Sequence, residues 1–494
     1  MKKRNNLRIP LCRALAAACC FLVLQGCAPA PSTSSPSCAP AAPDSAPTGD
    51  APAPAAPDWR QDPALLADLS PTPSHLTAAT GGAYLQDNGL LCYIDAATAA
   101  LVPLCAAPSC AHDGAECTAW LYGQPGFRAF AADGESLYFF RTPVYDAGAG
   151  ETASDDAFPA LVRMDPSGAD ARVLYRCASG ESLSLSGIDS AADCARDRDH
   201  LYFFTTLTQD GAVLVSRLMT LTLSTGEVTA RPLPPLAQGQ QTAPPRFAGV
   251  WGRRLLLEQD TYTLGAADAE SGVFAIENQT THLFALDPAT LEAEALCEVP
   301  PDYLDAAAGQ YGVHTVSDGV LYSFRYPSFD EGLPGGYVLT ARDLASGEQR
   351  TLFEAQRHAF PGTVDYTFPP AFLAGQIFFS LRQDEPEFGG APSSTPDPDA
   401  ASFSLWAVGL AAGEARDATV PCVWSTGAQG VLMPRALLSS GLVLAEAGAT
   451  LTPATQVWED GTVTRDPDIQ RNYVLIPLDD LLAGRDASAA VARA

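Results

Sequence analysis

The feature that most constrains this chain is a repeated strand–turn–strand phrase along most of its length. Runs rich in aromatic and aliphatic residues each follow a tight turn and recur every 54 to 66 residues, beginning at Asp133, Asp197, Trp251, Ser317, Leu373 and Ser439. A short apolar segment precedes each run, and a second hairpin follows it. One unit therefore holds four strands.

Four-stranded units of this kind cannot bury both of their faces alone, and their radial repetition is the β-propeller. We predict an all-β propeller of four-stranded blades, with seven blades when a first unit at Gly81 is included. Six and eight blades are the alternatives. A pair of packed antiparallel sheets would also be all-β, but it does not explain the regular spacing.

Aspartates open the tight turns of several second hairpins, and a Thr or Gly closes each turn. An aspartate at the first turn position accepts backbone N–H bonds, and Gly tolerates the positive φ that follows. We therefore interpret four such residues as turn formers before any catalytic role, namely Asp95, Asp165, Asp287 and Asp343.

Composition narrows the range of functions. The formal net charge is −28, and loss of the first 26 residues, which carry five basic residues and no acidic one, makes it −33. A surface this acidic repels phosphate backbones, so we do not expect nucleic-acid binding. Residues 27–494 contain no lysine, which excludes P-loop and lysine Schiff-base chemistry.

Residues 1–26 have the pattern of a signal peptide. A basic start precedes an apolar run from Ala14 to Leu24 that is too short to span a bilayer comfortably. The end, Leu24-Gln25-Gly26-Cys27, resembles the lipobox of bacterial lipoproteins, which implies that Cys27 becomes the lipidated first residue. The alternative is a signal peptide cleaved elsewhere, with Cys27 incidental. The lipobox implies an extracytoplasmic protein, lipid-anchored to the cell membrane.

The rest of the chain divides by composition. Residues 27–58 are almost entirely Pro, Ala, Ser and Thr, which predicts a semi-extended tether that lifts the folded part off the membrane. A lead-in segment, 59–80, precedes the propeller, which we place at 81–479, and a short helix and tail follow at 480–494. We expect Tyr473–Leu478 to close the ring against the Gly81 unit.

Three cysteines and one histidine cluster within thirteen residues, with the spacing C-x4-C-x-H-x4-C: Cys105, Cys110, His112 and Cys117. Three thiols and an imidazole are the ligand set of a structural Cys3His zinc site. Exported proteins usually pair their cysteines, and Cys92 makes the local number even, so disulfides are the first alternative and unpaired thiols the second. Cys177 and Cys194 flank a predicted turn and could form a local disulfide.

The motif Pro103-Leu104-Cys105 through Cys117, written PLC-x2-P-x-C-x-H-x4-C, resembles one found early in a group of propeller lipoproteins. These are proteins of clostridial-type Gram-positive bacteria, akin to TolB-type propellers. The resemblance covers nearly all of the exported chain and implies a β-propeller lipoprotein, but no activity is tied to the motif. Cys92 departs from the aromatic residue usual at that position.

Function is less constrained than fold. Neither H-E-x-x-H nor G-x-S-x-G occurs, so we predict no catalytic residue. Binding sites usually lie on long loops of a rigid scaffold, and we expect four long acidic loops on one face, at 142–158, 260–279, 325–336 and 382–400. We predict a monomer that binds a protein or carbohydrate there without catalysis. The alternatives are a glycan-active hydrolase or lyase and a structural subunit of an envelope or transport complex.

The first testable prediction concerns the lipobox. Replacing Cys27 with Ser should release or mislocalise the protein without unfolding it, because only the acylated residue would hold it at the membrane. Fractionation and mass spectrometry of the native protein test this, and an unmodified Cys27 would end the lipoprotein interpretation.

Overall fold

The computed structural model describes most of the chain beyond residue 75 and two short pieces before it. The described residues are 60, 66–68, 76–79, 81–87, 90–107, 109–112, 117–119, 127–132, 136–141, 159–184, 194–209, 212–237, 241–267, 274–299, 310–328, 335–364, 370–382, 403–423, 429–453, 456–457, 463–464 and 467–493. The predicted signal peptide, Cys27, the predicted tether, the predicted loop at 142–158 and all but the first residue of the predicted loop at 382–400 lie outside them.

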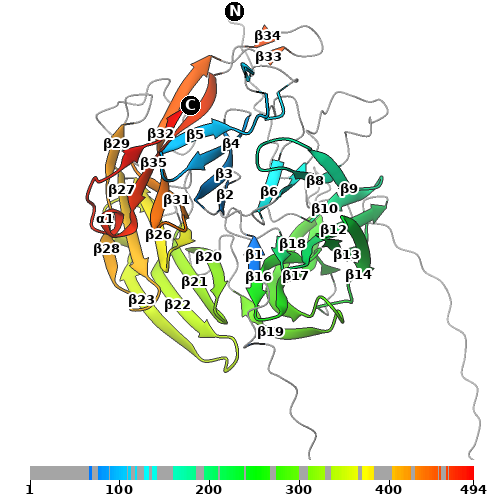
Figure 1. Ribbon diagram of the computed structural model, residues 1–494. Helices are drawn as coiled ribbons and strands as arrows, with labels where there is room; N and C mark the ends of the chain where they lie inside the picture. Colours follow the sequence, from blue (N-terminus) through cyan, green and yellow to red (C-terminus); the bar gives the residue numbers. More distant parts are fainter. Residues whose placement is uncertain are drawn as a thin grey trace, which may run out of the picture.

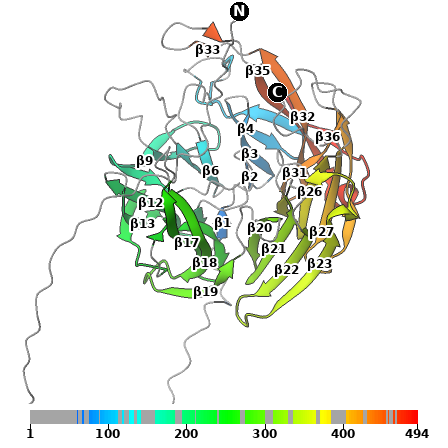
Figure 2. The same cartoon turned by 180° about the vertical axis from the view of Figure 1, so that it is seen from behind.

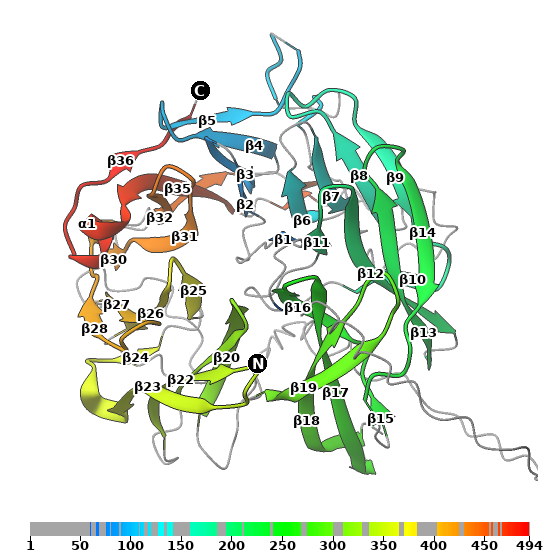
Figure 3. The same cartoon turned by 60° about the horizontal axis from the view of Figure 1, so that its bottom comes forward.

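The chain forms a seven-bladed β-propeller, as predicted, and the blades follow one another around a ring (Figure 3). Blade 1 contains β2 (Leu76–Ala79), β3 (Gly82–Asp87), β4 (Leu90–Asp95) and β5 (Ala100–Pro103). Blade 2 contains β6 (Phe127–Ala132), β7 (Leu137–Arg141), β8 (Ala160–Met164) and β9 (Arg172–Arg176). Blade 3 contains β11 (Cys194–Arg196), β12 (His200–Gln209), β13 (Ala212–Thr222) and β14 (Glu227–Pro232).

The second half of the ring repeats this order. Blade 4 contains β16 (Arg246–Trp251), β17 (Arg254–Ala267), β18 (Phe274–Leu286) and β19 (Ala293–Val299). Blade 5 contains β20 (Gln310–Ser317), β21 (Val320–Pro327), β22 (Gly336–Asp343) and β23 (Gln349–Gln356). Blade 6 contains β25 (Ala371–Leu373), β26 (Gln376–Arg382), β27 (Phe403–Gly409) and β28 (Ala415–Asp417). Blade 7 contains β31 (Met433–Leu437), β32 (Leu442–Pro453), β35 (Pro467–Pro477) and β36 (Ala489–Ala490).

Short elements decorate the blades. An extra strand pairs with the second strand of blades 3, 4 and 6, namely β10 (Glu181–Leu183), β15 (Gln241–Thr242) and β24 (Thr363–Val364). Two small hairpins are β29 (Pro421–Val423) with β30 (Gln429–Val431), and β33 (Gln456–Val457) with β34 (Val463–Thr464). The β33–β34 hairpin projects beyond the ring in both side views (Figures 1 and 2). Helical pieces of the described chain include η3 (Arg357–Ala359) and α1 (Leu478–Leu482). No helix in the described part of the chain is long and apolar enough to cross a membrane.

The predicted aromatic runs are the second strands of the blades, and they are apolar on both sides because both sides are buried. In β12, Phe203 packs in the junction with blade 2, whereas the next residue, Phe204, packs in the junction with blade 4. The described residues form seven buried clusters, one at each junction between neighbouring blades. A strand buried on both faces reads as a continuous hydrophobic run.

The turn aspartates act as predicted. Asp95 Oδ1 accepts the backbone N–H groups of Ala97 and Thr98 at 2.8 and 3.1 Å. The equivalent oxygens cap the same turn in other blades, in Asp165, Asp287 and Asp343. The hydrogen-bonding capacity of these carboxylates is therefore used within their own turns.

These turns define the two faces of the ring. The turns between the first and second strands and between the third and fourth strands share one face, which we call the short-turn face. The remaining links share the opposite, long-loop face. One predicted loop is wrong: much of 260–279 is strand, since β17 runs to Ala267 and β18 begins at Phe274. The β-branched and aromatic residues at 261–264 favour a strand, so they extend the blade 4 hairpin instead of leaving it.

The C-terminal residues close the ring. β36 pairs with β35 of blade 7, and β37 (Ala492–Arg493) pairs in parallel with β5 of blade 1. The predicted closing strand Tyr473–Leu478 lies instead within β35 and α1, and only its side chains, including Tyr473, pack against blade 1. The backbone pairing that closes the ring therefore comes from the segment that was predicted to be a tail. Hydrophobic patterning could not reveal it, because the paired segment is too short to show a pattern.

The lead-in segment also belongs to the propeller, which begins before Gly81. β2 is the inner strand of blade 1, and β1 (Leu66–Asp68) pairs with β11 on the inner edge of blade 3. β1 also contacts the inner strands β6 and β16, so it lies on the inner side of the ring (Figure 3).

The closing contact gives a stability prediction. Asp87 is 3% exposed and pairs with Arg493, whose guanidinium also donates to the Arg471 carbonyl at 2.6 Å. Replacing Arg493 with Gln should lower the free energy of unfolding by about 2–3 kcal/mol, because the buried Asp87 carboxylate loses its partner. This value already allows for solvent screening at Arg493, which is partly exposed. Urea denaturation measures the loss.

A surface pair supplies the control. Arg485 and Asp480 form an exposed ion pair at 2.6 Å. Replacing Arg485 with Gln should cost less than about 1 kcal/mol. Equal losses in the two variants would show that the Asp87–Arg493 pair stabilises the fold no more than an exposed ion pair does.

Candidate metal centre

The predicted cysteine cluster lies in the crossing from blade 1 to blade 2. Both ends of its loop are hydrogen-bonded to the backbone of the same residue, Leu91. The N–H of Leu104 donates to the carbonyl of Leu91 in β4 at 2.8 Å, and the N–H of Leu91 donates to the carbonyl of Ala119 at 2.9 Å. The Thr118 hydroxyl also donates to the Leu104 carbonyl at 3.3 Å. The loop therefore leaves and re-enters the sheet at the same place, the long-loop end of β4.

Within this loop the four predicted donors converge. The donor atoms of Cys105, Cys110, His112 and Cys117 all lie within 4.8 Å of one another. His112 Nδ1 and Cys117 Sγ are 3.3 Å apart. A tetrahedral zinc site with Zn–S of about 2.3 Å and Zn–N of about 2.0 Å has edges of roughly 3.5–3.8 Å. The arrangement fits such a site, and the cluster can hold a metal ion such as zinc.

Local backbone geometry explains the convergence. The N–H of Cys105 donates to the Pro103 carbonyl at 2.9 Å, and the N–H of Cys110 donates to the Ala107 carbonyl at 3.2 Å. His112 has φ of +56°, a left-handed conformation that non-glycine residues adopt only when their surroundings demand it. Its N–H donates to Cys110 Sγ at 3.4 Å. Two tight turns thus fold the donors back toward each other.

The electrostatics of the cluster favour a thiolate. Burial alone would raise the pKa of Cys105, but the Ala107 N–H and the thiols of Cys117 and Cys110 stabilise its anion and lower the pKa to about 6. Burial and the neighbouring sulfurs raise the pKa of Cys117 to about 12. One sulfur therefore carries the charge while its neighbour keeps a proton, and a cation would hold both as thiolates.

The other predicted cysteines lie elsewhere. All eight described cysteines are free thiols. Cys92 packs into the junction between blades 7 and 1, whereas its neighbour Leu91 packs into the junction between blades 1 and 2. Burial is the main reason why the pKa of Cys92 is raised. Cys177 and Cys194 are each buried, at 3% and 1% exposure, and Cys194 belongs to the core between blades 2 and 3.

Spacing in the sequence revealed all four donors but not what holds them. The supports at Leu91, Thr118 and Ala119 carry no motif of their own. A polar cleft between blades 4 and 5 also went unpredicted, because its residues come from separate strands and share no local pattern.

Comparison with known proteins adds a fold-level likeness only. No protein-family profile and no curated protein matches the sequence. One similar solved structure is an oligogalacturonate lyase from Vibrio parahaemolyticus, with 10% identity, 78% of this chain and 89% of that chain covered, and a TM-score of 0.38. The propeller domain of the Trilobed protease from Pyrococcus furiosus has 11% identity, coverage of 81% and 92%, and a TM-score of 0.38. Dipeptidyl peptidase 4 from Porphyromonas gingivalis has 9% identity, coverage of 85% and 60%, and a TM-score of 0.36. Similarity this distant says nothing about activity.

The metal centre can be tested through His112. If the four donors hold zinc, the purified protein should contain one zinc per chain, and Cys110→Ala and His112→Ala should each lose it, since a closed site needs all four ligands. Elemental analysis measures the metal. Limited proteolysis should show a loosened loop in both variants, while most of the ring stays folded.

Cys297→Ala is the matched control, because Cys297 is a thiol in β19 outside the cluster and should leave the zinc in place. Disulfides would give the opposite pattern. The protein would be metal-free, His112→Ala would be silent, and thiol counting on unfolded, unreduced protein would find these cysteines blocked.

Proposed function

We propose that this protein is a lipid-anchored, extracytoplasmic binding propeller that presents its long-loop face to a protein or carbohydrate partner and catalyses no reaction. The observation that carries the proposal is the position of Arg60, the described residue nearest the tether. Its place indicates from which face the chain reaches the ring.

Arg60 is held at the short-turn face. Its Nη2 lies 2.7 Å from Glu294 Oε1, and its Cζ stands 5.5 Å from the centre of the Trp251 ring. Trp251 ends β16 beside the turn to β17, and Glu294 is the second residue of β19, beside the turn from β18. An ion pair and a cation–π contact together fix the guanidinium there.

The predicted tether would then determine at which face the ring is attached. From Cys27 to Arg60 the chain advances 33 residues. Such a segment spans at most roughly 110–120 Å when fully extended. A chain anchored at Cys27 would therefore attach the propeller at its short-turn face, so the long-loop face would lie farther from the membrane on average.

The position of the metal centre also favours the long-loop face as the binding surface. The loop from Cys105 to Cys117 begins and ends at the long-loop end of β4. A structural zinc ion there would cross-link the loop at four positions and so stiffen it. A rigid surface loses less conformational entropy when it binds a partner.

The absence of lysine after residue 26 offers a direct test of orientation. Ser179, in the crossing from blade 2 to blade 3, is exposed at the long-loop face, and Ser440, in the turn before β32, is exposed at the short-turn face. Ser179→Lys and Ser440→Lys each create a single side-chain amine for a fluorescent donor. In vesicles that carry acceptor lipids, the lipidated Ser440→Lys protein should be quenched more strongly than the Ser179→Lys protein. Equal or reversed quenching would overturn the orientation.

The same two variants test the binding face. An amine-reactive photocrosslinker on membranes from the source organism should capture a partner from the Ser179→Lys variant and not from the Ser440→Lys variant, since only the former carries its amine on the outward face. Capture from both variants alike, or from the short-turn variant alone, would contradict binding through the long-loop face.

A further inference from the structure

The metal loop begins at a point where blade 1 touches blade 2. Gly168, in the turn between β8 and β9 of blade 2, lies against the peptide group that joins Leu104 to Cys105. A Cβ atom added to Gly168 would lie 2.0 Å from the Leu104 carbonyl oxygen and 3.2 Å from the Cys105 nitrogen. No side chain fits in that space. The backbones of the two blades therefore meet at the first of the four candidate metal ligands.

The same interblade contact recurs around the ring. Each sheet twists from its inner to its outer strand, so the outer strand comes beside the turn of the next blade. The outer-strand residue is a leucine nine positions after the aspartate of its own turn or of the equivalent turn, as in Leu104 after Asp95, Leu174 after Asp165 and Leu352 after Asp343. Its partner is a glycine of positive φ in the next blade, which gives the pairs Leu104–Gly168, Leu174–Gly226 and Leu352–Gly413.

What holds the leucine in place differs between the blades. In blades 2 and 5 the outer strands run on to Arg176 and Gln356, so sheet pairing continues past the contact. In blade 1, β5 ends at Pro103, and the N–H of Leu104 makes a last bond to the Leu91 carbonyl. The metal loop follows at once. The four donors therefore lie where sheet pairing supports the outer strands of blades 2 and 5.

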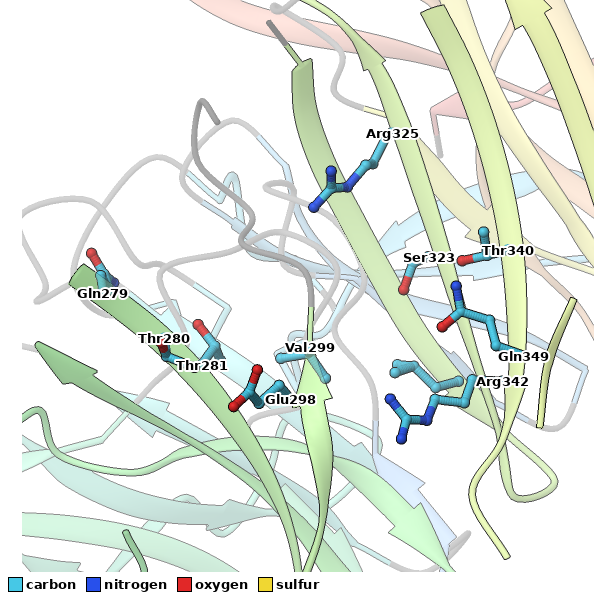
Figure 4. Close-up of a pocket in the computed structure, with 11 residues that line it drawn as sticks. Gln279, Thr280, Thr281, Glu298, Val299, Ser323, Arg325, Thr340, Arg342 and Gln349 are labelled. Atoms are coloured by element: carbon cyan, nitrogen blue, oxygen red, sulfur yellow. The ribbon is translucent and has the colours of Figure 1, made fainter. Parts of the chain in front are cut away.

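Among the described residues, the junction between blades 4 and 5 lacks this contact. Gly347 closes the Asp343 turn of blade 5 with a similar positive φ, but an added Cβ would meet no atom of the described residues within 4 Å. A cleft of about 400 Å³ lies between these two blades, lined by residues of both, such as Val299 of β19 and Gln349 of β23 (Figure 4). The contact at Gly168 is therefore not imposed by the ring itself, and Gly347 offers a matched control.

We propose that the metal centre ties blade 1 to blade 2. With a zinc ion on the four donors, the Leu104–Cys105 peptide group is held against Gly168, and Gly168 in turn is a positioning residue that places Cys105 for the metal. Metal binding is linked to folding because it gathers ligands that would otherwise separate, and here the link extends to the neighbouring blade. The inference rests on the candidate metal centre and not on the face that binds a partner, so it can fail while the proposed function stands.

Hydrogen–deuterium exchange tests whether the metal acts on blade 2. In its turn, the N–H of Asp165 donates to the Ala169 carbonyl at 2.9 Å, and the N–H of Gly168 donates to the Asp165 carbonyl at 2.8 Å. Removing zinc from the full-length protein with a chelator should speed exchange of these two amides by about five-fold or more, because the turn loses a fixed neighbour. The turn from Asp343 to Gly347 is the control, since the amides of these two residues are bonded in the same way and should not change.

The outcomes separate the tie from the metal centre. Unchanged exchange in the blade 2 turn of a protein shown to lose its zinc would overturn the tie and leave the metal centre standing. An equal rise in both turns would also overturn it, because the metal would then act on the whole ring. A protein that takes up no zinc would overturn both the tie and the metal centre.

Substitutions test Gly168 as a positioning residue. Gly168→Ala should weaken zinc binding by about ten-fold or more, because the new methyl group must displace the Leu104–Cys105 peptide group. Competition with a chromogenic chelator measures the affinity. Gly413→Ala introduces the same clash at the junction between blades 5 and 6, 1.8 Å from the Leu352 oxygen, and Gly347→Ala introduces the backbone strain without a clash. Both should keep the zinc affinity of the wild type.

Equal loss of zinc affinity in Gly168→Ala and Gly413→Ala would show a general effect of a destabilised ring and would overturn the positioning role. The exchange experiment needs no variant, so it decides the proposal even if Gly168→Ala does not fold.

Discussion

The structure depends on burial of both faces of every blade against its neighbours. Each junction holds its own apolar cluster, and the junction between blades 7 and 1 is built like the others, from Leu85, Ile94, Leu444 and Leu475 among further residues. A row of such blades would leave two large apolar faces in water, so the last blade must meet the first. The C-terminal end of the described chain serves this need, because β37 adds a backbone pair across the closing junction. At the other end, β1 lies inside the ring, beside the inner strands of blades 2, 3 and 4.

Charge is the second constraint, because an acidic chain must still neutralise the carboxylates that it buries. Arg435 donates to Glu446 through two nitrogens, at 3.1 and 2.6 Å, in the last blade. Glu258 in blade 4 meets His314 at 2.5 Å and Arg246 at 3.4 Å. Burial works to raise the pKa of Glu258, but these partners outweigh it and lower the pKa, so the carboxylate stays ionised. Arg342, which lines the cleft between blades 4 and 5, makes no ion pair with the described residues.

The metal centre and the polar cleft use the scaffold in different ways. The metal centre is local: all four donors come from one short loop, and the sheet supplies only its two ends. The cleft is tertiary: its walls come from two blades, and Asp260, the strand partner of Thr281, accepts the Thr281 hydroxyl in one of them. A local site can be found from spacing in the sequence, whereas a site between blades cannot.

The sequence by itself determined the repeating unit and the turns, favoured seven blades over six or eight, and gave the candidate metal-ligand set. Each of these depends on neighbours within a few residues, as Asp95 caps Ala97 and Thr98 in its own turn. The lipobox and the tether are also local patterns, and they stay predictions. Tertiary structure alone decided how the ring closes, because β37 contains two residues and has no hydrophobic pattern. It also decided that Arg60 meets Trp251 and Glu294, and that strands of blades 4 and 5 line one cleft. These contacts join residues that are tens to hundreds of positions apart in the sequence. The curvature of the ring brings them together in space, and no local sequence pattern encodes that curvature.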